Sequence, residues 1–203
     1  MPLQWAATET NLGAALRTLG ERESDTAKLE EAVAAFREAL KERSSERVRL
    51  NWAIAQRNLD NALRTLGYAR FHQGDFAAAA LDLQEAVDGT NAYLIIWLYL
   101  ARARTGRQDA KRDLEQWAAE LKSAQWPFPV VKLFLEQGTP EAMVAAADKP
   151  EERCEAQYYL GQWYLLRGAR ANSIEALRNA VESCPKGFIE YNGALAELKR
   201  LAQ

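Results

Sequence analysis

Apolar residues recur along this chain at the three- and four-residue spacing of amphipathic helices. One such stripe consists of Leu29, Ala32, Val33, Phe36 and Leu40. The sequence lacks the sustained two-residue alternation that would indicate a strand. Glycines and prolines divide the helical pattern into segments of roughly one to two dozen residues. The pattern therefore predicts an all-α protein of eleven helices, paired antiparallel by short turns.

Capping and breaking residues place the ends of these helices. Asp25 or Ser24 suits the N-cap of the second helix, and Asn91 suits that of a later, apolar helix. We expect Gly20 to stop the first helix. The stretch 47–73 is either one helix or two that meet at Gly67, and the sequence leaves both open. The expected helices cover approximately 3–19, 25–40, 47–73, 76–87, 91–104, 108–123, 130–137, 140–147, 151–167, 171–183 and 187–201.

The hexapeptide Ala-Leu-Arg-Thr-Leu-Gly occurs at 15–20 and again 47 residues later, at 62–67 (62 − 15). Self-similarity at this period indicates a repeat array. We interpret the two copies as lying in different frames, because Leu19-Gly20 ends a helix whereas Leu66-Gly67 begins the pattern of a new repeat. On this interpretation, 47–73 is the junction between two repeat types.

Composition and charge narrow the function classes. The chain has 203 residues, with 26 Lys and Arg against 28 Asp and Glu, so its net charge is −2. Nucleic-acid binding needs a basic surplus or stripe, so we expect no nucleic-acid partner. The longest apolar run, 92–101, is too short to span a membrane, and the N-terminus has no export signal or lipidation cysteine. We expect a cytoplasmic protein, or a periplasmic or envelope one if the chain is a fragment, because 2–20 already has the pattern of a repeat interior.

The sequence offers no catalytic or metal-binding constellation, so we expect no enzyme activity, cofactor or metal. The single histidine, His72, rules out a multi-histidine metal site and argues against a Ser-His-Asp or Cys-His centre. We expect His72 to be structural, at a negative helix end that favours a cation. Cys154 and Cys184 lie at adjoining ends of antiparallel helices, where a disulfide is geometrically feasible. We nevertheless expect two free thiols, as in a reducing cytosol.

The best-defined local pattern lies at 157–185. Its small, bulky and breaking positions are Leu160, Gly161, Tyr164, Gly168, Ser173, Leu177, Ala180 and Pro185. Small residues let two helices approach closely, bulky residues fill the gap between them, and proline ends the unit. This pattern resembles the tetratricopeptide repeat (TPR), a helix–turn–helix unit of about 34 residues. The resemblance implies a right-handed superhelical α-solenoid of antiparallel helix pairs.

The pattern recurs twice in the N-terminal half. One copy keeps the spacing and consists of Leu66-Gly67, Gly74, Ala79, Leu83 and Ala86. The other consists of Leu12-Gly13, Ala32, Phe36 and Ala39, and its Gly-to-Ala spacing is 19 (32 − 13) instead of 12 (79 − 67). The seven extra residues fit the longer TPR variants.

The C-terminal half resembles NlpI-type bacterial lipoproteins through 97–101, 159–168 and 188–198. Those lipoproteins are TPR adaptors at the outer membrane that bind a protease and cell-wall hydrolases, but this chain lacks their lipidation signal. We expect one solenoid over 1–203, with long-variant repeats in 1–73. The segment 74–203 is the NlpI-like part, with a degenerate middle and a capping helix at 187–202.

In TPR proteins the first helix of each pair lines a concave groove, which implies partner-binding positions here. Asn11 directly precedes the Leu of a Leu-Gly pair and Asn58 that of a Leu-Asp pair, and an amide can both donate to and accept from peptide backbone. Arg17, Asn61 and Arg64 lie on neighbouring turns and can grip a carboxylate. The alternative is that all five are ordinary surface polar residues.

Tyr159 and Gln162, with Tyr158 and Leu166, are candidates for the C-terminal part of the groove. The alternative for these residues is packing against the next helix. For the segment 126–129, Trp-Pro-Phe-Pro, we expect a buried corner in preference to an exposed hook.

The sequence thus predicts a non-catalytic interaction scaffold that binds a peptide or protein in a concave groove. Two alternatives remain open. The chain is a self-associating segment of a larger TPR protein, in which case it forms a homo-oligomer, or it is an NlpI-like adaptor for an envelope hydrolase.

Overall fold

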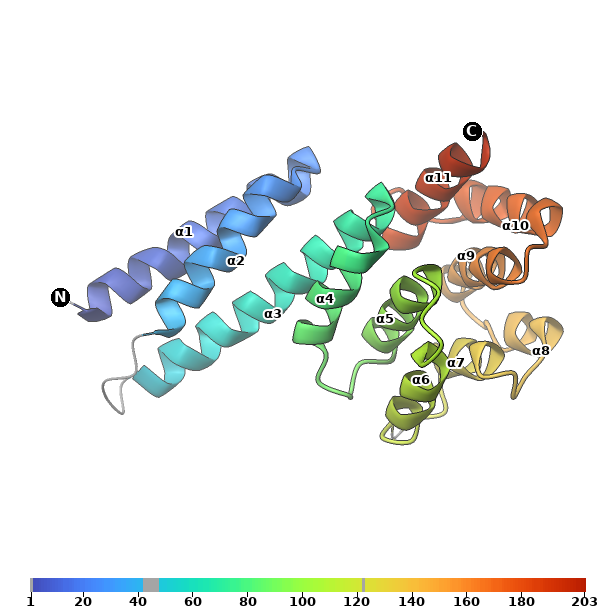
Figure 1. The fold of residues 1–203 in the computed structure, drawn as a ribbon, viewed down its shortest axis with the longest axis horizontal. Coiled ribbons are helices and arrows are strands. Elements are labelled where there is room, and N and C mark those ends of the chain that lie inside the picture. Colours follow the sequence, from blue (N-terminus) through green and yellow to red (C-terminus); the bar gives the residue numbers. More distant parts are fainter. Residues whose placement is uncertain (1, 42–47, 122) are drawn as a thin grey trace.

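A computed structural model describes residues 2–41, 48–121 and 123–203, and within them the protein is all-α, as predicted (Figure 1). The described residues form eleven helices and no strand. Their bounds are α1 Pro2–Glu23, α2 Thr26–Leu40, α3 Val48–Gln73, α4 Phe76–Ala86, α5 Ala92–Arg104, α6 Ala110–Ala118, α7 Phe128–Phe134, α8 Pro140–Ala145, α9 Pro150–Leu166, α10 Arg170–Ser183 and α11 Ile189–Leu201. None of these helices combines the length and the apolar character that crossing a bilayer requires.

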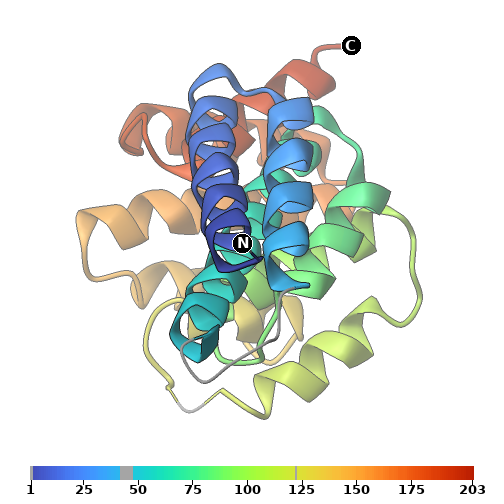
Figure 2. The same ribbon diagram turned by 90° about the vertical axis from the view of Figure 1, so that its left-hand side faces the viewer.

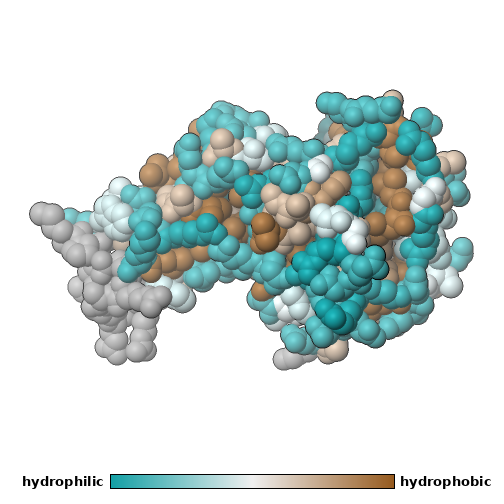
Figure 3. Space-filling view, viewed as in Figure 1, coloured by the Kyte–Doolittle hydropathy of each residue, from teal (hydrophilic) through white to brown (hydrophobic). Residues whose placement is uncertain are grey.

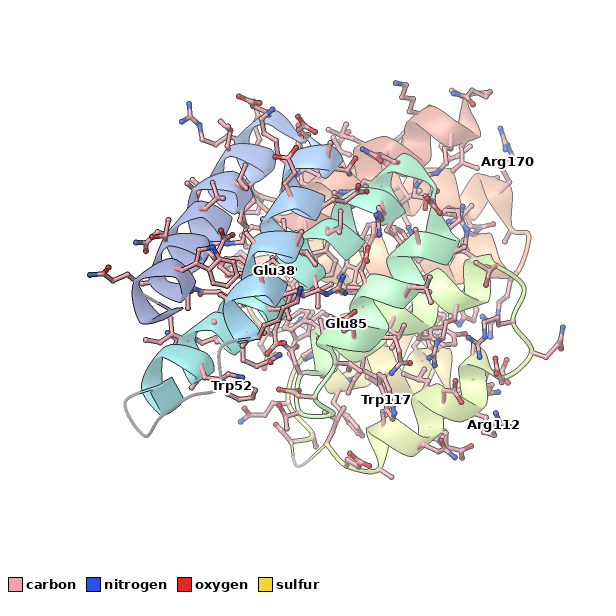
Figure 4. The ribbon with its side chains drawn as sticks, turned by 60° about the vertical axis from the view of Figure 1, so that its left-hand side comes forward. Glu38, Trp52, Glu85, Arg112, Trp117 and Arg170 are labelled. Carbon is pink, nitrogen blue, oxygen red and sulfur yellow. A yellow bond between two sulfur atoms is a disulfide. The ribbon has the colours of Figure 1, made fainter. Side chains whose placement is uncertain are left out.

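Consecutive helices pack against each other along the chain. Figure 2 shows α1 and α2 side by side, and both contact α3. On the neighbouring pair, Glu85 of α4 faces α2 (Figure 4), where its carboxylate accepts a 2.6 Å hydrogen bond from Arg37. The last helix departs from this sequential order, because α11 contacts α3 as well as α9 and α10. The chain therefore returns to its N-terminal half at its end.

Glycines allow the paired helices to approach closely. A Cβ on Gly67 would lie 2.6 Å from Cγ of Leu83, and a Cβ on Gly161 would lie 2.7 Å from Cγ of Leu177. Both leucines are fully buried. On the α9–α10 pair the hydroxyl of Ser173 also donates a 2.9 Å hydrogen bond to the carbonyl of Gly161. The small and bulky positions of the sequence pattern are therefore packed against each other across each helix pair.

The expectation that Gly20 stops the first helix is wrong. α1 continues to Glu23 and ends where Ser24 adopts a left-handed φ of 54°, and Asp25 then caps α2 with its carboxylate. Gly20 instead packs closely against α2, since a Cβ on it would lie 2.8 Å from Cγ of Leu29. A glycine inside a helix with tertiary packing is tolerated because the packing offsets its low propensity.

Both copies of the hexapeptide therefore lie inside a helix, so the part of the two-frame interpretation that ends a helix at Leu19-Gly20 is wrong. α3 runs without a break from Val48 to Gln73, so Gly67, like Gly20, lies inside a helix. Residue 47, the expected start of this helix, lies outside the described residues.

The seven extra residues of the first pair divide between its two helices. The N-cap Asp25 lies 12 residues after Gly13 (25 − 13), whereas the N-cap Asp75 lies 8 after Gly67 (75 − 67). Four residues, about one turn, thus lengthen α1, and the remaining three lengthen α2. Each helix of the pair is longer by about one turn, so Gly13 still faces Phe36 across the pair, as Gly67 faces Leu83.

The middle of the chain consists of short helices around an aromatic corner. α6 is shorter than the expected 108–123, and the peptide bond between Trp126 and Pro127 is cis. Pro127 is buried and Trp126 is half-buried, with its indole Nε1 donating a 2.6 Å hydrogen bond to Glu155. The segment 126–129 is accordingly a packed corner.

The core is centred on Trp97 of α5. Its ring contacts Phe71 and Tyr68 of α3, each at 5.0 Å between centroids, and Tyr158 of α9 at 5.4 Å. These aromatic side chains join helices that are far apart in the sequence into one hydrophobic cluster.

The prediction of two free thiols is wrong, because Cys154 and Cys184 form a disulfide with an S–S distance of 2.07 Å. Cys154 lies in the first turn of α9, and Cys184 directly follows α10. The antiparallel pairing of these helices places the two Cα atoms 4.9 Å apart, which is within the range for a disulfide. The disulfide joins the start of α9 to the end of α10, opposite the turn that connects the two helices.

Candidate binding groove

A hollow of about 760 Å³ lies where α1, α3, the start of α5 and α11 meet, and we call it the inner groove. Helix α3 forms its floor, the end of α1 forms one wall, and α11 forms the opposite wall. Its lining residues are Gly20, Glu21, Ser24, Leu29, Arg64, Thr65, Tyr68, Ala69, His72, Gln73, Asn91, Tyr93, Gly187, Ile189 and Asn192.

Polar side chains continue along α3 from the groove. Asn58, Asn61, Thr65, Tyr68 and His72 follow one another at spacings of three and four residues, which places them on one face of the helix. The last three line the inner groove. The structure thus places the predicted Asn58 and Asn61 on the same face as the groove, within about two turns of it.

The two predicted binding residues of α1, Arg17 and Asn11, lie at different distances from the inner groove. Glu21, on the groove wall, accepts a 2.5 Å hydrogen bond from Arg17 and a 3.3 Å hydrogen bond from Thr65 of α3. Arg17 therefore holds a groove residue in place and is already ion-paired. Asn11 is exposed about three turns before Glu21, at the far end of the same face.

Arg64 carries the cationic character of the groove. Its guanidinium donates a 3.0 Å hydrogen bond to Oδ1 of Asn61, and within the described chain no carboxylate pairs with it. The neighbouring Tyr68 stays neutral, because burial raises the pKa of its hydroxyl well above the usual value. The floor of the groove thus presents a guanidinium, with the Asn61 amide beside it at the edge of the groove, and such groups recognise peptide carboxylates and carbonyls.

His72 lies at the deep end of the groove, and the expectation of a cation there is wrong for the histidine itself. Burial, and after it the positive charge of Arg200, lowers the pKa of His72 to about 4, so the ring is neutral at physiological pH. The cation at this helix end is Arg200, whose Nη1 donates a 2.6 Å hydrogen bond to the His72 carbonyl. His72 packs edge-on against Trp97 at 5.6 Å, which is a structural role.

Tyr159 and Gln162 do not line an open groove, because both are fully buried. The hydroxyl of Tyr159 donates a 2.9 Å hydrogen bond to Glu190, and Nε2 of Gln162 donates a 3.3 Å hydrogen bond to Glu197. Both acceptors belong to α11. The structure thus supports the alternative of packing against a following helix, and these two residues hold α11 against α9.

The neighbouring candidates also lie away from the groove. Tyr158 is buried against Trp97. Leu166 is half-buried at a separate hollow of about 390 Å³, which it lines together with Phe134 and Arg107.

Two buried glutamates connect α11 to the rest of the fold. Burial by itself raises the pKa of Glu197, but Arg200 and Arg104 more than offset this effect and hold that pKa below its usual range. Their guanidinium nitrogens lie 2.9 and 2.6 Å from the Glu197 carboxylate. Glu190 forms no ion pair with a cation among the described residues, and burial, followed by the charge of Glu155, raises its pKa to about 7.

Sequence reasoning missed the wall formed by Ile189 and Asn192. That wall depends on the return of α11 to α3, which no local pattern encodes. A signal was nevertheless present in Glu190 and Glu197, two charges on a helix whose neighbouring positions are apolar. Such charges indicate a buried polar network when they fall on a packing face.

No protein-family model matches this sequence. The described residues also contain no group of three or more His, Cys, Asp and Glu side chains that could hold a metal ion. The TPR assignment therefore stays a prediction, supported by the spacing of residues and by the packing of the glycines.

Proposed function

We propose that this protein is a non-catalytic interaction scaffold built as a solenoid of TPR-like helix pairs. Its inner groove holds an extended peptide or a helix of a partner protein. The observation that carries the proposal is the hollow between α1, α3 and α11, whose floor presents Arg64 and Thr65, with Asn61 hydrogen-bonded to Arg64 just outside it. The groove is concave and lies on preformed helices, so binding costs little ordering of the scaffold.

The solenoid reading is supported by a contact that recurs in three helix pairs. Gly13 faces Phe36, Gly67 faces Leu83 and Gly161 faces Leu177, in each case with a Cβ that would approach within 3 Å. The same contact thus closes each helix pair into one unit, and repeat proteins are stacks of such units.

The groove favours partners that carry a carboxylate next to an extended backbone. Arg64 is the charged group of the floor that no described carboxylate neutralises, and the amides of Asn58 and Asn61, on the preceding turns of α3, can pair with backbone groups next to it. Tyr68 and Tyr93 add apolar ring surface at the deeper end. An acidic side chain or a chain terminus would therefore bind at Arg64.

A specific observation favours an envelope adaptor as the second candidate. The Cys154–Cys184 disulfide is the state expected in an oxidising compartment, whereas cytosolic proteins keep their thiols reduced. This bond supports the NlpI-like alternative over a cytoplasmic scaffold. Thiol titration of the protein, purified from its source without reductant and then unfolded, distinguishes them: two reactive thiols would argue for the cytoplasm.

The proposed function is tested by selecting binders from a library of displayed peptides. We expect the wild-type protein to enrich peptides with acidic residues or free carboxyl termini. The double variant Asn58→Ala and Arg64→Glu should lose that enrichment, while Arg178→Glu, at an exposed site on α10, should retain it. Equal enrichment by wild type and double variant would remove the groove as the binding surface.

A further inference from the structure

The outer side of α1 carries an uncovered apolar stripe. We call Trp5, Thr8, Leu12, Ala15 and Leu19 the outer stripe; they repeat at spacings of three and four residues along one side of the helix. The three bulky members are 44%, 47% and 37% exposed. Figure 3 shows apolar residues reaching the surface over the N-terminal helices.

The leucines at the matching positions of α3, 47 residues later, are buried. Leu59, which is 47 residues after Leu12 (59 − 12), is 5% exposed, and Leu66, 47 residues after Leu19 (66 − 19), is 2% exposed. Helix α3 carries these leucines and packs against α2 and α1. The stripe of α3 is therefore a helix-packing surface, and the outer stripe of α1 has the same chemistry without a helix upon it.

Other exposed bulky apolar side chains do not form a comparable surface. Trp52 lies near the first turns of α3 (Figure 4), and is the repeat counterpart of Trp5. Leu81 and Leu195 are each exposed on their own helices, α4 and α11. Single exposed leucines are normal, whereas an ordered stripe along about four helical turns marks an interaction surface.

We propose that the outer stripe binds the outer stripe of a second copy of this chain, with the two α1 helices antiparallel about a two-fold axis. Trp5, Leu12 and Leu19 repeat every seventh residue, the spacing that keeps side chains on the seam between two coiled helices. The small residues Thr8 and Ala15 alternate with them. If the two-fold axis passes between Gly13 and Ala14, the leucines of one helix lie opposite the small residues of the other.

In that register each bulky residue meets a small or complementary one. Leu12 faces Ala15 of the second copy, Leu19 faces Thr8 of the second copy, and the Trp5 ring faces Arg22 of the second copy, a cation–π pair. The stripe contains no charged residue, so two copies do not repel each other across it. The contact is isologous and closes on itself, so it produces a dimer and no filament.

The test is the molar mass in solution, measured by light scattering at low and high concentration of the intact protein. We expect twice the chain mass for the wild type at the higher concentration. Leu12→Glu and Ala15→Lys should each halve that mass, because each places a charge in the apolar seam. Mixing the two variants should restore the twofold mass, since the new carboxylate then faces the new ammonium in the heterodimer.

Leu81→Glu is the matched control, because it adds the same charge at an exposed leucine outside the stripe and should leave the dimer intact. Circular dichroism checks that each variant remains helical. A wild type that is monomeric at both concentrations would overturn the proposal and assign the stripe to a different chain. A dimer that survives Leu12→Glu, or that Leu195→Glu dissociates instead, would place the interface elsewhere and overturn it as well.

Discussion

Arg200 donates a 2.6 Å hydrogen bond from Nη1 to the backbone carbonyl of His72, across 128 residues of sequence. This bond joins the last helix to the end of α3 and supplies the cation that the negative end of α3 favours. Because α11 forms one wall of the inner groove, the same bond holds the groove in shape. The binding surface therefore depends on the contact between α11 and the C-terminal end of α3.

Arg200→Ala should weaken the docking of α11. It removes the bond to His72 and leaves the buried Glu197 with Arg104 as its remaining guanidinium partner. We expect a loss of about 2–4 kcal/mol in the free energy of unfolding, the usual cost of breaking a buried charged network. Urea denaturation measures it, with Lys199→Ala at the adjacent exposed position as control. Equal midpoints for the two variants would show that Arg200 does not help to hold α11 in place.

Glu190 should make the stability of the fold depend on pH. Its pKa rises from 4.5 in the unfolded chain to about 7 in the fold, chiefly through burial. Between these values the folded state binds more protons than the unfolded state, so the free energy of unfolding falls as pH rises and levels off above about 7. Glu190→Gln should remove this dependence, because a neutral amide occupies the site at every pH.

The predicted gain of Glu190→Gln over the wild type is small near pH 4 and reaches at most about 3 kcal/mol above pH 7. Denaturant titrations across this range measure the difference, and Glu182→Gln at an exposed position of α10 should change nothing. A difference that is constant with pH would contradict the assignment of the titration to Glu190.

Gly161→Ala should destabilise the last helix pair. Its new Cβ would lie 2.7 Å from Cγ of Leu177, so the pair must separate, at a cost of about 1–3 kcal/mol. Gly187→Ala, where a Cβ meets no atom within 4 Å, is the control and should be nearly neutral. Combining Gly161→Ala with Leu177→Ala should cost less than the sum of the two single changes, since the methyl then fills part of the space left by the leucine. Strictly additive costs would mean that the two residues do not pack as described.

Removing the disulfide should lower stability without unfolding the chain. The bond closes a loop with a sequence separation of 30 residues, for which chain entropy predicts a loss of about 3–4 kcal/mol. The variant with both Cys154→Ala and Cys184→Ala should show it as a lower urea midpoint at unchanged helix content. If reductant leaves the wild-type midpoint unchanged, the disulfide is absent from the protein in solution.

The sequence was sufficient to predict the local structure. Helical periodicity and caps such as Asp25 and Asn91 predict most helices correctly, and the small and bulky positions around Gly161 and Leu177 predict the packing of their pair. The error at Gly20 arose because glycine has two uses in helices, as a stop and as a close-packing site. Only the facing residue, Leu29, decides between them.

The long-range structure was beyond what the sequence could predict. The burial of Tyr159 and Gln162 follows from their hydrogen bonds to α11, and the wall at Asn192 follows from the return of α11 to α3. Neither contact leaves a local pattern. Asn58, Asn61 and Arg64 were placed on the groove face because they share a helix with it, and their role as binding residues stays a prediction.

The central claim is that partners bind in the inner groove, and site-specific photo-crosslinking in the source cells tests it most directly. A photoreactive phenylalanine is introduced by Thr65→benzoylphenylalanine on the groove floor and, separately, at Leu81 on the exposed side of α4. The account predicts a partner crosslinked from position 65 that is lost when Arg64→Glu is added, and no such product from position 81. The same partner captured from position 81 but not from position 65 would contradict it.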